Sequence, residues 1–145
     1  MYEFYVGTTP KDPPGNIVKV CLDSDGQLVD KSYYEAVSPA YLCRKGSCIY
    51  AVIENADFGG VQVFDVNKNG SLTAKARLDT EDVYSTYISA EKRGNRIFVA
   101  NYGTPSCAVY RYEAEKLVQE SVLREKKTEK SHIHCAALTP EEAYV

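Results

Sequence analysis

An internal repeat of about 45 residues is the feature that most constrains how this chain can fold. Each copy starts with a short apolar run, followed by a turn containing Gly or Pro and then a strand of alternating apolar and polar residues. The apolar runs begin at Phe4, Ile49 and Ile97, and a fourth, at 143–145, is cut off by the end of the sequence. The alternating strands begin at Ile17, Val61 and Cys107. A pattern of this period indicates a repeat architecture.

Each copy also contains two further short strands. Asp25-Gly26-Gln27-Leu28 and Asn69-Gly70-Ser71-Leu72 are matching turns that lead into one of them, and a weaker third copy lies at 115–117. The other strand precedes the second, third and fourth apolar runs, at 40–43, 85–88 and 134–138. Four short strands in about 45 residues are the size of a propeller blade. The sequence therefore predicts an all-β fold of β-propeller blades, each with four antiparallel strands.

The repeat predicts that residues 1–145 form the N-terminal part of a single propeller domain and contain roughly three blades. With strands lettered A to D from the axis outward, the expected parts are 2–35 (strands B to D of blade 1), 36–80 (blade 2), 81–125 (blade 3) and 131–145 (the start of blade 4). The charged segment 112–130 is expected to be a strand followed by a solvated loop over 124–130. Even four blades need about 180 residues. We therefore expect the chain to be part of a longer protein or, if it is whole, to self-associate through its open sheet edges.

Composition excludes several classes of function. The net charge is −3, so the chain lacks the basic face that a nucleic-acid partner requires. No apolar run approaches the roughly 18–20 residues that cross a bilayer, and the first residues do not resemble a signal peptide. The five cysteines include no CxxC pair and are expected to be small buried hydrophobic residues in a reducing cytosol. A cytoplasmic protein with neither a membrane nor a nucleic-acid partner is expected.

The two histidines of the chain, His132 and His134, are candidates for chemistry. In a strand, residues two apart point to the same face, so both rings would lie at the axial mouth of the blades. A neutral imidazole is the commonest general base near neutral pH. The structural alternative is a histidine that forms hydrogen bonds at a blade edge. A metal site has no supporting Asp, Glu or Cys cluster, and no nucleotide or calcium motif is present. Neither a metal nor a cofactor is expected.

Polar residues also follow the apolar runs of the second and third repeats. Glu54 follows one run, and Asn101-Tyr102 ends the other. These residues would either cap the strands and form the turns or line the same axial opening as the histidines. The two interpretations are equally compatible with the pattern.

Four segments, in order, resemble the propeller-type lactonase family. Residues 98–103 (FVANYG) with Val109-Tyr110 resemble its F-V-A-N-Y-G…V-Y segment, and residues 4–8 (FYVGT) resemble its F-Y-I-G-T-Y start. Residues 50–55 (YAVIEN) resemble its Y-A-V-N-E, and 132–140 resemble its H-A-H…F-S-P. The family includes bacterial 6-phosphogluconolactonases and fungal carboxymuconate cyclases.

The resemblance implies a seven-bladed propeller with a metal-free site at one mouth of its channel. It implies hydrolysis of a sugar lactone, 6-phosphoglucono-δ-lactone of the pentose phosphate pathway, with this small molecule as the partner. The family's catalytic histidine lies six residues before the Pro of its S-P turn, which is His134 here. The implied substrate-binding residues are His132, Asn101, Tyr102 and Glu54. The family's arginines and its glutamate from later blades have no counterpart in this chain, and Ile53, Pro105 and Glu141-Glu142 depart from its pattern.

Two other functions remain open at this point. A propeller can serve as a non-catalytic binding or scaffold module, because this fold hosts many functions. A carboxymuconate-type lactonising cycloisomerase would share His134 and act in the reverse sense, with proton transfer to or from carbon. Assays on both substrates would separate the two enzymes.

Overall fold

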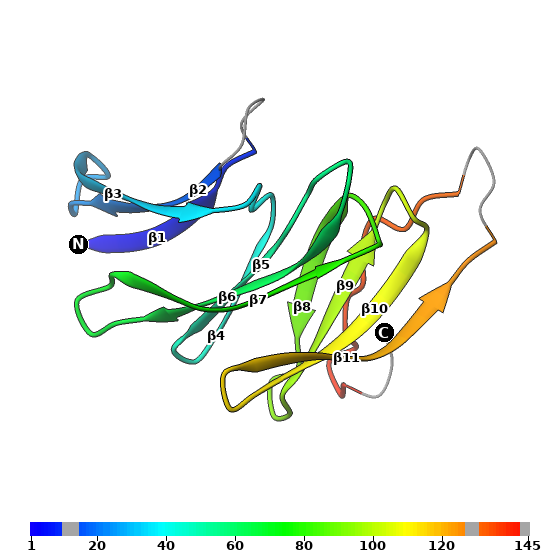
Figure 1. Ribbon diagram of the computed structural model, residues 1–145. Coiled ribbons are helices and arrows are strands. Elements are labelled where there is room, and N and C mark those ends of the chain that lie inside the picture. The colour runs from blue at the N-terminus through cyan, green and yellow to red at the C-terminus, as the bar shows by residue number, and fades with distance from the viewer. Residues whose placement is uncertain (10–14, 127–130, 143–145) are drawn as a thin grey trace.

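The computed structural model describes residues 1–9, 15–126 and 131–142, which form strands and no helix. The strands make three antiparallel sheets that follow one another in chain order (Figure 1). The first sheet contains β1 (Tyr2–Gly7), β2 (Gly15–Leu22) and β3 (Leu28–Ala36). The second contains β4 (Leu42–Lys45), β5 (Cys48–Val52), β6 (Gly59–Val66) and β7 (Leu72–Thr80). The third contains β8 (Ser85–Ala90), β9 (Arg96–Asn101), β10 (Ser106–Glu113) and β11 (Lys116–Arg124). The prediction of an all-β fold with four-stranded propeller sheets is confirmed.

The hairpin turns follow from local backbone chemistry. Gly26 and Gly70 have φ values of 78° and 75°, a conformation that glycine adopts without steric cost. The third sheet makes the corresponding connection with a shorter turn that lacks glycine, in which Ala114 and Glu115 both take positive φ. Residues 116–124 consequently form a full strand, so Arg124 ends β11 instead of starting the solvated loop that we expected. Residues 127–130 of that loop lie outside the described residues.

The sheets pack face to face, and the core lies between them. One cluster joins the first and second sheets, and a larger one joins the second and third. The larger cluster includes Val63 and Val99, whose side chains are fully buried. Burial of one such side chain contributes roughly 1.5–3 kcal/mol. Each sheet is therefore stabilised chiefly by its neighbour, as expected of stacked blades.

The described residues after β11 do not form the strand predicted at 134–138. Instead, residues 131–142 lie along the third sheet (Figure 1), with Ile133, Ala136 and Leu138 against its apolar face. The Ser89 hydroxyl donates to the Ala136 carbonyl at 2.6 Å. A β-ladder needs a neighbouring strand, and the expected partner, 143–145, lies outside the described residues. The segment is thus held by side-chain packing and not by a ladder.

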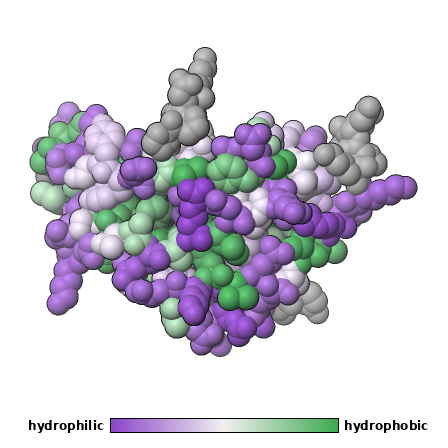
Figure 2. Space-filling model, viewed as in Figure 1, coloured by the Kyte–Doolittle hydropathy of each residue, from purple (hydrophilic) through white to green (hydrophobic). Residues whose placement is uncertain are grey.

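The face of the molecule seen in Figure 2 is mostly hydrophilic, with scattered apolar patches. Within the described residues β1 pairs only with β2, and Tyr2 and Phe4 on β1 are exposed. Self-association through this edge stays a prediction. We find no helix long and apolar enough to cross a membrane in the described parts of the chain. Their cysteines are all free thiols, and Cys135 is exposed, contrary to the expectation that the cysteines are buried.

Alkaline pH is expected to destabilise the fold through its buried tyrosines. Burial raises the pKa of Tyr110 to about 12, so the folded state keeps a proton that the unfolded state loses above pH 10. The free energy of unfolding should therefore fall as pH rises from 10, by about 2 kcal/mol near pH 12 from this residue. Urea unfolding at pH 8 and at pH 11–12 measures the effect.

Tyr110→Phe is the matched variant for this prediction. The Tyr110 hydroxyl is buried and makes no hydrogen bond of normal geometry within the described residues, although Thr80 lies near enough to influence its pKa. The variant should be at least as stable as the wild type at pH 8, because an unsatisfied buried hydroxyl costs about 1–3 kcal/mol. It should also lose less stability at alkaline pH. An equal alkaline loss in both proteins would contradict the assignment.

Candidate functional site

Tyr102, directly after β9, contacts the rings of both histidines. The His132 ring stacks on the Tyr102 ring with centroids 3.9 Å apart and planes within 2°. The His134 ring meets Tyr102 edge-on, at 5.9 Å and 88°. All three side chains are solvent-exposed. We call Tyr102, His132 and His134 the mouth cluster.

Apolar packing places the histidines at this position. Ile133 and Ala136 lie on the face of the third sheet, beside Phe98 and Ala100 of β9. The histidines flank Ile133 in sequence, and both of their rings face Tyr102. The mouth cluster is therefore assembled by the seating of residues 131–142 on β9.

A hydrogen bond orients the His132 ring. Its Nδ1 lies 3.0 Å from the Tyr102 carbonyl oxygen. A carbonyl only accepts hydrogen bonds, so Nδ1 carries the proton in this contact. In the neutral ring the lone pair then resides on Nε2. This arrangement leaves Nε2 available to accept a proton or a hydrogen bond.

Glu54 lies on the neighbouring sheet at the same end. Its backbone N–H donates to the Ser38 carbonyl at 3.0 Å, and its carboxylate makes no hydrogen bond to any residue that the structure describes. Two backbone bonds connect the strand ends: Tyr84 N–H donates to the Asn55 carbonyl, and Tyr102 N–H to the Tyr84 carbonyl, each at 2.9 Å. Glu54 therefore lies along the same edge as the mouth cluster, but no contact joins them.

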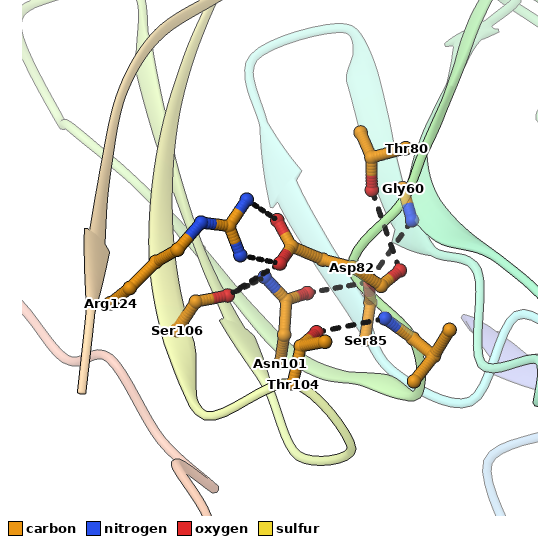
Figure 3. Close-up of polar contacts among 9 residues, drawn as sticks. Gly60, Thr80, Asp82, Ser85, Asn101, Thr104, Ser106 and Arg124 are labelled. Atoms are coloured by element: carbon orange, nitrogen blue, oxygen red, sulfur yellow. Dashed lines mark hydrogen bonds and ion pairs between the residues drawn. The ribbon is translucent and has the colours of Figure 1, made fainter. Parts of the chain in front are cut away.

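Asn101 is fully buried, and its side chain belongs to a polar network (Figure 3). Its side-chain oxygen accepts from the Ser85 hydroxyl at 2.7 Å, and its amide nitrogen donates to the Ser106 hydroxyl at 2.9 Å. The Ser85 hydroxyl in turn accepts from Gly60 N–H, at 3.0 Å, on the second sheet. Both functional atoms of Asn101 are thus engaged within the protein.

The network ends at Asp82, between β7 and β8. Its carboxylate is almost fully buried and accepts from the Ser106 hydroxyl at 3.0 Å. Arg124, at the end of β11, pairs with both carboxylate oxygens. A buried carboxylate needs such a partner, because removing the partner leaves an uncompensated charge.

The two ends of the network determine its direction. A backbone N–H can only donate and a carboxylate can only accept, so each hydroxyl and the amide between them has one satisfied orientation. The sequence pattern did not predict the pairing of Asp82 with Arg124, because these residues lie 42 positions apart and no local motif links them. Only the stacking of the blade strands brings them together.

Two further tyrosines lie at this edge of the sheets. Tyr41 and Tyr84 are exposed and directly precede β4 and β8. Burial raises the pKa of Tyr87 to about 12, and its ring contacts Tyr41 at 4.6 Å. Across the described residues, no three His, Cys, Asp or Glu side chains gather as a metal site.

Curated relatives match almost the whole chain but less than half of their own length. A 6-phosphogluconolactonase of Bacillus subtilis (strain 168) is 28% identical over 157 residues, covering 99% of this chain and 45% of the relative. An uncharacterised protein of Staphylococcus epidermidis is 25% identical over 154 residues, covering 97% and 45%. The chain thus spans about 45% of the length of these relatives.

Solved structures share the fold. A Bacteroides uniformis protein assigned as a 6-phosphogluconolactonase superposes with a TM-score of 0.79 at 20% identity, covering 95% of this chain and 43% of that one. A protein from Lactobacillus plantarum gives 0.74 at 19% identity, covering 94% and 43%. The sequence model of the family described as "Lactonase, 7-bladed beta-propeller" matches residues 3–145. The chain therefore belongs to the seven-bladed β-propeller lactonase family.

Proposed function

We propose that the protein hydrolyses a sugar lactone, 6-phosphoglucono-δ-lactone, with the mouth cluster as part of its site. The observation that carries the proposal is the gathering of two exposed imidazoles on Tyr102 at one end of the blades. Family membership and the name of the Bacillus subtilis relative support this choice of reaction and substrate. The chain spans less than half of the length of this relative. The activity is therefore proposed for the full-length protein to which these residues belong.

In the proposed reaction His134 acts as the general base. Its imidazole takes a proton from water as the water oxygen bonds to the lactone carbonyl carbon. The tetrahedral oxyanion then collapses, the ring C–O bond breaks, and the proton passes to the departing ring oxygen. The product is the open-chain sugar acid. Donors that stabilise the oxyanion are expected outside residues 1–145, as the family resemblance implies.

The remaining candidates would bind and orient the substrate. Tyr102, His132 and Glu54 face solvent at least in part, so they are available to the lactone. The exposed rings of Tyr41 and Tyr84 offer further flat surfaces on which a sugar ring could lie. Asn101 contributes by holding the end of β9, since its amide is already bonded on both sides. A cytoplasmic location belongs to the same proposal and is compatible with the free thiols of the described residues.

Side-by-side assays test the proposal. The protein is supplied with 6-phosphoglucono-δ-lactone and with a carboxymuconate, and consumption of each is compared with its spontaneous rate. We expect accelerated loss of the lactone only. Turnover of the carboxymuconate alone would establish the cycloisomerase instead, and no acceleration of either would favour a non-catalytic binding module.

A further inference from the structure

The segment between β7 and β8, residues 81–84, is clamped between two neighbours; we call it the 81–84 linker. A Cβ added to Gly59 would lie 2.3 Å from the Asp82 carbonyl oxygen. On the other side, a Cβ on Gly103 would lie 2.7 Å from a side-chain carbon of Val83, 2.8 Å from a ring carbon of Tyr84 and 3.1 Å from the Val83 carbonyl oxygen. Gly59 therefore lets its backbone approach the Asp82 carbonyl more closely than any other residue would, and Gly103 leaves room for the Val83 and Tyr84 side chains. The linker has little freedom to move.

Hydrogen bonds fasten the linker to the turn that carries Tyr102. Gly103 N–H donates to the Val83 carbonyl at 3.1 Å, and Val83 N–H donates to the Thr104 hydroxyl at 2.9 Å. With the bond from Tyr102 N–H to the Tyr84 carbonyl, the turn is held at three consecutive residues. The position of Tyr102 thus depends on the position of the linker.

Asp82 anchors the linker at its outer end. Its carboxylate is held by Arg124 and by Ser106, and Ser106 is bonded to Asn101, the residue before Tyr102 (Figure 3). Tyr102 is consequently fixed from both sides, by Asn101 on β9 and by the linker. Its carbonyl oxygen is the acceptor that selects the Nδ1–H form of His132.

We propose that Asp82 and Arg124 are positioning residues that set the ring orientation and the tautomer of His132 through Asn101 and Tyr102. Neither touches the mouth cluster directly. Their pairing fixes the linker and the end of β9, these fix the Tyr102 carbonyl, and that carbonyl holds the proton of His132 on Nδ1. The effect on turnover rests on the proposed function, whereas the effect on His132 does not.

Imidazole NMR tests the proposal without any substrate. The chain has two histidines, so each ring is resolved and assigned by His132→Gln and His134→Gln. In the wild type, nitrogen shifts of the neutral His132 ring should show the Nδ1–H form, and its ring protons should be shifted by the stacked Tyr102. Asp82→Asn should remove both signatures, giving the Nε2–H form that free imidazole prefers. The matched control is Asp79→Asn, which breaks an exposed pair with Arg77 and should leave His132 unchanged.

A second variant keeps the proposal falsifiable if Asp82→Asn does not fold. Arg124→Gln alters a half-exposed side chain, removes the partner of Asp82 and should produce the same loss of both signatures. Unchanged His132 signals in either folded variant would overturn the proposal. Where the lactone is turned over, kcat should fall about 10- to 100-fold in these variants with KM within about twofold. Absence of turnover in the wild type would count against the proposed function alone, since the NMR result stands without it.

Discussion

Replacement of His134 by alanine is expected to lower kcat for lactone hydrolysis by about 10²- to 10⁴-fold, the usual contribution of a general base. The loss should appear in kcat and in kcat/KM together, because the proton transfer occurs only in the transition state. The side chain is exposed and lies at the edge of the Tyr102 ring, so its removal should leave the fold and the His132 stack intact. Steady-state kinetics on the lactone, with circular dichroism to verify folding, measure the effect.

Two neighbouring variants serve as controls. Cys135→Ala changes an adjacent exposed side chain and should leave kcat within about twofold of the wild type. His132→Ala removes the stacked ring and should affect substrate orientation without removing the base. Retention of wild-type kcat by His134→Ala would exclude His134 as the base, and a loss confined to His132→Ala would transfer that role to His132.

Gly59→Ala is expected to destabilise the protein by about 3 kcal/mol, the upper part of the range for overpacking a close-packed site. The new methyl group would meet the Asp82 carbonyl at 2.3 Å and the Ser85 hydroxyl at 2.4 Å. Neither neighbour can retreat, because Ser85 is fully buried within the polar network and Asp82 is held by Arg124. Urea unfolding with a fixed m-value measures the loss of stability.

Gly26→Ala separates this steric effect from glycine's conformational freedom. Gly26 has a positive φ of 78° but open space around it, so its substitution should cost only about 1 kcal/mol. Equal losses in the two variants would show that the close approach of β6 to the 81–84 linker does not stabilise the fold.

Strand periodicity made the blades predictable. The alternating residues of β2, β6 and β10 and the Gly-containing turns before β3 and β7 are local signals. The Ala114–Glu115 turn carries no such signal, so the extent of β11 was underestimated. The prediction of a strand at 134–138 was wrong for a different reason. A β-ladder requires a partner strand, and the local sequence does not show whether one is present. The division into repeats at 36–80 and 81–125 stays a prediction.

The candidate site was predictable only where its residues lie in recognisable segments. Tyr102, His132 and His134 fall in such segments, and the structure brings them together. Asn101 was found by the same signal, but its burial within a network depends on Ser85 and Ser106, which no pattern singled out. The roles of these residues and of Glu54 in binding or catalysis stay predictions.

The mouth cluster is proposed to contribute to lactone hydrolysis. The most direct measurement is the first-order decay of 6-phosphoglucono-δ-lactone in the presence of equal amounts of wild-type protein and His134→Ala, beside its spontaneous decay in buffer. We expect rapid decay with the wild type and a rate near the spontaneous one with the variant. Spontaneous decay in all three samples, or equal acceleration by both proteins, would contradict it.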